Sequence, residues 1–158
     1  MSSKFATRLK LFWTHGDNLR HLVGTNLNCQ RLGKLPKYLW ELVNNSRFQQ
    51  LSWLEAKTQL TNLPLSKYCD FNFKNLVYSL PDKYTFEIRI FPVWLEAKLI
   101  VFAAELIEGI LNQAISLPYI PPQETLSWDL VKVQYFLDNL PISQSTHRFW
   151  QNRAIAQN

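Results

Sequence analysis

Five polar side chains are spaced along two predicted strands in a pattern that could bind an anion or a metal ion. Asp70, Asn72 and Lys74 alternate with apolar residues on the first strand, and Glu87 and Arg89 do so on the second. A carboxylate two residues from an arginine on one strand face lies about 7 Å from it. It could then hold a divalent cation while the arginine contacts a phosphoryl oxygen. A plain surface ion pair is the alternative, which spacing alone favours by roughly two to one.

The elements that would position these side chains are a hairpin and a long helix. Residues 68–78 and 84–91 both show the period of two that is typical of half-buried strands, and residues 81–83 form a predicted turn between them. A helix is predicted from about residue 95 to 116, and it is apolar over most of its surface, as expected for a helix packed across a sheet. The fold class predicted from this order is α+β.

Shorter helices are predicted on both sides of the hairpin. Gly16 and Asp17 could divide the first of them into two, and Ser52 with Glu55 forms a capping box at the start of the third. Ser127 and Ser143 are the predicted N-caps of the last two. The predicted ranges are 4–23, 36–45, 52–60, 128–137 and 143–154.

Composition indicates a soluble, cytoplasmic protein. The chain has 158 residues, the size of one ordinary domain. Cys29 and Cys69 form no C-x-x-C pair, which favours reduced thiols in the core over a disulfide framework or a zinc cluster. The N-terminus lacks the features of a secretory signal. The longest apolar stretch, Leu99 to Leu111, is interrupted by glutamates and is expected to be too short to span a membrane.

Other sequence features give weaker indications of function. The net charge is +5, but the basic residues are isolated, so a solvated basic face is favoured over a nucleic-acid site by roughly three to one. His15, His21 and His147 lack metal-ligand spacing, and the four glycines form no phosphate-binding loop. A nucleic-acid-binding module is therefore only the third alternative considered.

The hairpin and the helix after it resemble a known family. Residues 71–76 and 85–92, followed by the long apolar helix, are similar to the C-terminal part of the amidoligases, and residues 19–24 and 30–33 resemble the preceding segment more loosely. The resemblance covers about residues 5 to 115. The amidoligases are related to glutamate-cysteine ligases and, more distantly, to glutamine synthetase, within the carboxylate-amine ligase superfamily.

The resemblance implies an enzyme that uses ATP and magnesium. Such an enzyme phosphorylates a carboxylate substrate, and an amine substrate then displaces the phosphate to form an amide. By position in the motif, Glu87 would be a magnesium ligand and Arg89 would contact the nucleotide phosphate or the acyl phosphate. Asn72 and Lys74 would lie near the nucleotide or substrate. These roles suit the residue types, because magnesium binds few protein carboxylates and the arginine fork matches phosphate.

Two departures from the family pattern suggest an incomplete site. Val93 and Trp94 replace the glycine and small polar residue that usually follow the second strand, and they would crowd a close backbone approach to a ligand. The family's opening strand with paired glutamates has no counterpart. We therefore expect a companion chain or another segment to complete the site. A non-catalytic interaction or assembly module is the alternative.

These expectations divide the chain into three parts. Residues 1–117 would form the amidoligase-like part, residues 118–127 a proline-rich connector, and residues 128–158 a C-terminal helical extension.

Overall fold

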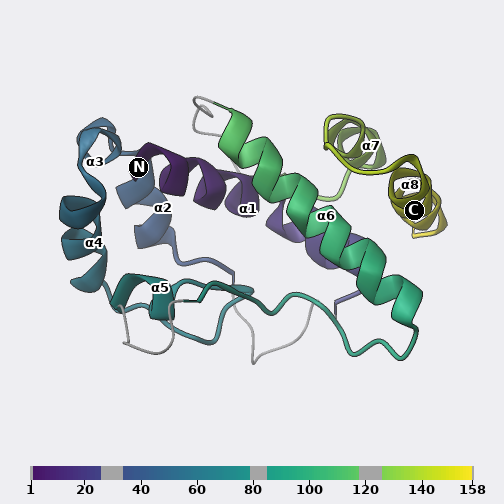
Figure 1. Cartoon of the computed structure of the whole chain (residues 1–158), viewed down its shortest axis with the longest axis horizontal. Helices are drawn as coiled ribbons and strands as arrows, with labels where there is room; N and C mark the ends of the chain where they lie inside the picture. The colour runs from purple at the N-terminus through teal and green to yellow at the C-terminus, as the bar shows by residue number, and fades with distance from the viewer. Residues whose placement is uncertain (1, 26–33, 79–84, 118–125, 158) are drawn as a thin grey trace.

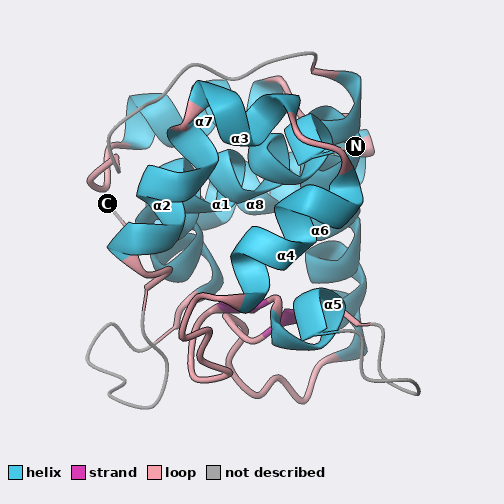
Figure 2. Cartoon of the chain, turned by 90° about the vertical axis from the view of Figure 1, so that its left-hand side faces the viewer, coloured by secondary structure: helices cyan, strands magenta, loops and turns pink. Residues whose placement is uncertain are grey.

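The computed structural model describes residues 2–25, 34–78, 85–117 and 126–157. The protein is mostly helical (67%), with one small two-stranded antiparallel sheet, so it agrees only loosely with the predicted α+β class. Figures 1 and 2 show helices forming most of the molecule, with the short strands near one end. The elements in chain order are α1 (Ser2–Val23), α2 (Lys37–Asn44), α3 (Ser46–Gln50), α4 (Trp53–Thr61), β1 (Phe71–Asn72), α5 (Lys74–Tyr78), β2 (Glu87–Ile88), α6 (Ala97–Ser116), α7 (Leu130–Asp138) and α8 (Gln144–Ala156).

The first helix, α1, is continuous and is not divided at Gly16. It ends at Gly24, whose φ of 80° is readily adopted only by glycine. The amide of Gly24 donates to the carbonyl of His21, and the amide of Thr25 donates to that of Arg20, which closes the last turn. A glycine inside a helix costs about 1 kcal/mol relative to alanine. Burial of the apolar face of α1 outweighs that cost. The buried residues of this face include Leu9, Phe12, Leu19 and Leu22.

The two strands are much shorter than predicted. Among the described residues, the pairs between the two strands are Phe71 with Ile88 and Asn72 with Glu87. The side chain of Asn72 accepts a hydrogen bond from the backbone amide of Lys74 at 3.0 Å, and helix α5 begins there. Since an asparagine oxygen satisfies a free amide at a helix start, the first strand ends where the sequence predicted it to continue. The predicted turn, residues 81–83, lies outside the described residues.

The long helix α6 does not have the sheet as its main neighbour. It packs mainly against α1 and also contacts α8. The sheet instead packs on α1, where the ring of Phe12 lies 4.2 Å from that of Phe71 and 5.6 Å from that of Phe86. Figure 1 shows α6 running obliquely along α1. The N-terminal helix therefore forms the support that the sequence assigned to α6.

The capping residues define several of the other helices. Ser52 and Glu55 form the predicted capping box of α4, and Ser143 caps α8 as predicted. Helix α7 begins at Asp129, whose side chain accepts from the amide of Lys132, and not at the predicted cap Ser127. Asn45 ends α2 and caps α3, a short helix that the sequence analysis missed.

Helix α6 is also long and apolar enough, by length and composition alone, to cross a membrane. At 20 residues it is longer than the apolar stretch on which the sequence prediction was based. One third of its most apolar window is buried inside the protein. One such helix is weak evidence for a membrane span, because core helices of soluble proteins meet the same criterion. A cytoplasmic location stays a prediction.

Candidate functional site

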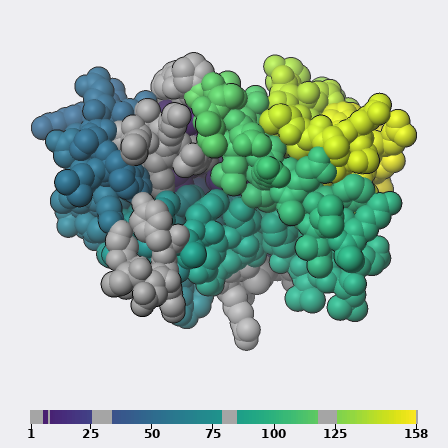
Figure 3. All heavy atoms as spheres, viewed as in Figure 1, coloured from purple at the N-terminus to yellow at the C-terminus, as the bar shows by residue number. Residues whose placement is uncertain are grey.

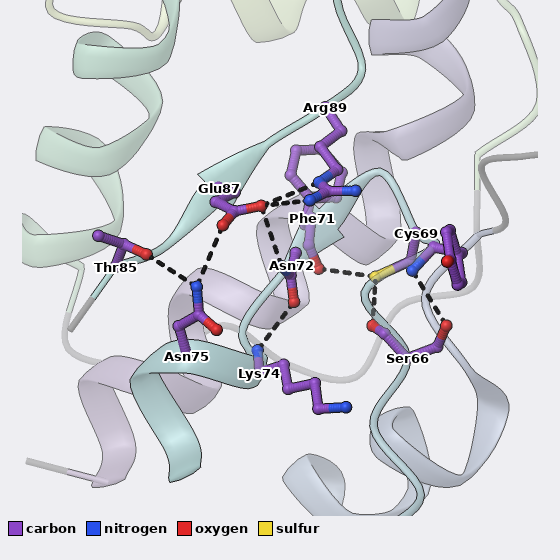
Figure 4. A network of polar contacts seen from close by, with 10 residues as sticks. Ser66, Cys69, Phe71, Asn72, Lys74, Asn75, Thr85, Glu87 and Arg89 are labelled. Carbon is purple, nitrogen blue, oxygen red and sulfur yellow. Dashed lines mark hydrogen bonds and ion pairs between the residues drawn. The ribbon is translucent and has the colours of Figure 1, made fainter. Parts of the chain in front are cut away.

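Glu87 and Arg89 form one hydrogen-bonded network with two asparagines (Figure 4). Arg89 donates to Glu87 Oε2 from Nε at 2.9 Å and from Nη2 at 2.6 Å. Asn72 Nδ2 donates to the same oxygen at 3.0 Å, and Asn75 Nδ2 donates to Oε1 at 3.1 Å. The sequence predicted that three of these four residues share a face of the hairpin, and the structure brings them together.

The network joins β1, β2 and α5, and the pairing of the two strands fixes the positions of Asn72 and Glu87. Asn72 lies opposite Glu87 in the strand pair, which fixes the distance between their side chains. Asn75 lies on the first turn of α5 and also donates to Thr85 Oγ1 at 3.2 Å. Asn75 was not among the predicted site residues, because residues 68–78 were predicted to form one continuous strand. Its separation of three residues from Asn72 is a helical spacing that could have revealed it.

The ion pair at the centre of the network is accessible to solvent. The side chains of Arg89 and Glu87 are 34% and 36% exposed, whereas Asn72 is only 2% exposed. The arginine fork points along the strand to the carboxylate, so the two formal charges cancel within one residue pair. Such a partly exposed pair contributes about 0–1 kcal/mol to stability.

Asp70 is separated from this network and has a structural role. Its carboxylate accepts two hydrogen bonds of 2.6 Å from Nε and Nη2 of Arg20 on α1, with both side chains about 95% buried or more. Loss of solvation on burial raises the pKa of Asp70, although the hydrogen bonds and charge of Arg20 act in the opposite direction. The sequence placed Asp70 on the polar face of a strand, but it lies just before β1 and points to α1. Arg20 was not among the predicted site residues, although it follows Gly16 by four residues and so shares a helix face with it.

Lys74 is likewise separated from the ion pair. It is exposed as the first residue of α5, and Figure 4 shows its side chain pointing away from Glu87. Its Nζ lies 5.8 Å from the centre of the Tyr78 ring. A role for Lys74 beside a nucleotide at Arg89 would therefore require the side chain to turn.

Magnesium does not fit the residues that this part of the chain supplies. Within the described ranges, no group of three histidine, cysteine, aspartate or glutamate side chains could hold a metal ion. Glu87 is a single carboxylate, and its two oxygens already accept from Asn72, Asn75 and Arg89. Magnesium requires near-octahedral oxygen ligation, and the arginine cation would repel it. The predicted metal role of Glu87 thus depends on ligands from elsewhere.

The described cysteine and histidines occupy structural positions. Cys69 is buried, and its thiol contacts the carbonyl oxygens of Ser66 and Phe71. Burial is the main cause that raises the pKa of Cys69, which disfavours the nucleophilic thiolate. The ring of His15 stacks on Phe136 and that of His21 lies against Trp128. Cys29 lies outside the described residues.

Comparisons with protein-family models, curated proteins and solved structures found no match to this chain. The resemblance to amidoligases therefore stays a prediction from the sequence segments named above.

Proposed function

We propose that this chain contributes Glu87 and Arg89 to the active site of an ATP- and magnesium-dependent carboxylate-amine ligase. The remaining ligands would come from a companion chain or from another segment. The observation that carries the proposal is an arginine fork held on a short sheet by a carboxylate and still about one third exposed. A guanidinium in that position can bind a phosphate or carboxylate group through two parallel hydrogen bonds.

The charge balance of the pair supports a composite site. Because Glu87 neutralises Arg89, the pair offers little net attraction for an anion. An anion on the arginine would also lie beside the Glu87 carboxylate, which would repel it. Further positive charge is needed before the site can bind a nucleotide. Additional carboxylates are needed before it can bind magnesium.

Calorimetry with magnesium and ATP tests this proposal directly. The titration uses this chain alone and then a mixture with the product of any adjoining reading frame that carries paired glutamates. We expect saturable binding only in the mixture, and amide formation there with a carboxylate and an amine. Glu87→Gln should abolish amide formation. Arg89→Lys should lower its rate at least about tenfold with little change in folding stability, because a point charge replaces a bidentate fork.

The matched control is Glu108→Gln, which removes one exposed carboxylate from α6, away from the network. It should leave both binding and amide formation unchanged. Unaltered activity in both Glu87→Gln and Arg89→Lys would contradict the assignment.

An assembly module is the second candidate, favoured by an exposed apolar segment between β2 and α6. Val93 is 92% exposed and Leu95 is 97% exposed. Among the described residues, no hydrogen bond partner engages the backbone of residues 93–95. Figure 3 shows α6, which follows this segment, at the surface of the molecule. An extended backbone with outward apolar side chains can pair with a strand of another protein.

The two candidates differ in what the complex does. We expect Val93→Asp combined with Leu95→Asp to prevent association with the adjoining gene product, measured by light scattering after gel filtration. Arg89→Lys should leave the association intact. A stable complex that binds no ATP in the presence of magnesium would favour the assembly module over the ligase.

A further inference from the structure

A small pocket lies on the α1 side of the sheet, apart from the Glu87 network. It has a volume of about 30 Å³, enough for about one water-sized group, and it opens to solvent. Its walls come from α1, from the segment that leads into α2, and from the start of β1. The lining residues are Phe12, Trp13, Gly16, Asp17, Lys34, Leu35, Asp70 and Phe71.

Gly16 creates the open space in this pocket. Outside the backbone of α1 itself, a Cβ atom built on Gly16 would have no neighbour within 4 Å among the residues that the structure describes. Close packing therefore does not require glycine here, and φ at this helical position is ordinary. Glycine inside a helix lowers stability by about 1 kcal/mol relative to alanine. The absence of a side chain at Gly16 leaves space beside the helix, in the pocket.

Asp17 is the hydrogen-bond acceptor at this pocket. Its carboxylate accepts from Lys34 Nζ at 2.6 Å, so a primary ammonium group already sits on it. The side chains of Lys34 and Asp17 are 63% and 30% exposed, and a pair of this kind is weak enough for a competitor to displace. The other carboxylate, Asp70, is committed to Arg20 through two short hydrogen bonds.

Aromatic rings make the rest of the pocket suitable for a cation with a small apolar body. Phe12 stacks on Phe71 at 4.2 Å between ring centres, and Trp13 stacks on Trp40 at 5.1 Å, so the walls are held firmly. Ring faces attract ammonium groups, by about 0.5–1 kcal/mol at exposed sites.

We propose that this pocket binds the primary ammonium group of a small amine, or of an amino group that ends a longer molecule, in competition with Lys34. Asp17 accepts the hydrogen bond, and the half-buried Trp13 ring contacts the carbon next to nitrogen. Phe12 and Phe71 are each only 1% exposed, so they support the pocket from within the core. The pocket adjoins the strand that carries Arg89, because the Arg89 amide donates to the Asp70 carbonyl at 2.7 Å.

Nuclear magnetic resonance of the labelled full chain tests the pocket without ATP or a companion chain. Methylammonium chloride is titrated at constant ionic strength, with tetramethylammonium chloride as the comparison, since it cannot donate a hydrogen bond. We expect saturable shifts of the Gly16 amide and the Trp13 indole signals with methylammonium only. Asp17→Asn should weaken binding at least about tenfold, the effect of losing a charge-assisted hydrogen bond.

Lys34→Ala gives a test in the opposite direction. It removes the internal competitor and should strengthen methylammonium binding several-fold. The matched control, Lys37→Ala, removes an exposed lysine that pairs with Glu41, and it should leave the affinity unchanged. Gly16→Leu should fill the space and prevent binding.

Two results would overturn the proposal: equal binding by the wild type and Asp17→Asn, or no gain in affinity from Lys34→Ala. The ligase proposal has a separate test in ATP binding by the mixture. Failure of methylammonium to bind while Arg89→Lys still slows amide formation would remove only the amine pocket. Saturable methylammonium binding together with no effect of Arg89→Lys on amide formation would contradict only the ligase proposal.

Discussion

Charged side chains that look alike in the sequence occupy very different environments in this protein. Arg20 is buried and bound to Asp70, Arg89 is one third exposed and bound to Glu87, and Lys34 is mostly exposed and bound to Asp17. Removing one partner of a buried pair costs about 3–5 kcal/mol, whereas an exposed pair contributes about 0–1 kcal/mol. Arg89, unlike Arg20, can therefore exchange its carboxylate for a ligand at low cost.

His15 makes folding stability depend on pH. Burial lowers its pKa from 6.5 to about 4, since its ring is enclosed beside Phe136. The unfolded chain takes up a proton near pH 6.5 and the folded chain only near pH 4. The stabilising contribution is therefore complete above pH 6.5 and is lost as the pH falls toward 4. The loss is about 3 kcal/mol at most.

The variant His15→Phe keeps a ring against Phe136 and removes the titrating group. Urea unfolding between pH 7 and pH 4 should give a smaller loss of unfolding free energy for His15→Phe than for the wild type. Parallel pH profiles for the two proteins would show that His15 does not titrate in this way.

At the scale of elements, local capping decided where helices begin, and it also ended the first strand. The alternation from Tyr68 to Tyr78 suits a strand, but Asn72 caps α5 and turns the chain after two paired residues. Hydrogen bonds within a segment form without bringing distant residues together, so they incur less loss of chain entropy than a long hairpin would. The sheet is short for that reason.

Two glycines inside helices should respond to substitution in opposite ways. A Cβ atom on Gly16 meets open space, so Gly16→Ala should raise stability by about 1 kcal/mol. A Cβ atom on Gly109 in α6 would collide with the Ile142 side chain, so Gly109→Ala should lower stability by about 1–3 kcal/mol despite the better helix propensity. Thermal unfolding of both variants measures the difference. Stabilisation in both cases would indicate that α6 does not pack closely on residues 140–142.

On the scale of the whole molecule, α1 is the central element. It contacts α2, α3, α6 and α8, and its Phe12 supports the sheet. The C-terminal helices are part of the same core: Trp150 on α8 is fully buried and donates to the carbonyl of Phe102 on α6 at 3.1 Å. Arg153 donates to the Leu22 and Val23 carbonyls at the end of α1. The described part of the predicted C-terminal extension thus packs against α1 and α6 through α8.

Trp150→Ala should therefore destabilise the whole chain, by about 3–5 kcal/mol, because it leaves a large cavity between α8 and α6. The control is Tyr135→Ala on α7, where the side chain is 71% exposed and the change should be within about 0.5 kcal/mol. Denaturant unfolding followed by circular dichroism compares them. A small effect for Trp150→Ala would mean that the C-terminal helices fold apart from the rest.

The sequence by itself determined the features that depend on neighbouring residues. The capping box at Ser52, the cap at Ser143 and the extent of most helices follow from hydrogen bonds within one turn. The proximity of Glu87 and Arg89 also follows from their spacing on one strand. These contacts need no information from distant parts of the chain.

Tertiary structure alone decided which polar residues are buried and what they bind. Asp70 joins Arg20 across 50 positions, and Asn75 and Asn72 reach Glu87 only because α5 and the strand pair bring them together. The same holds for the pocket beside Gly16, whose walls come from three separate segments. Burial and long-range pairing depend on how helices and strands pack, and residue spacing within a segment does not encode that packing.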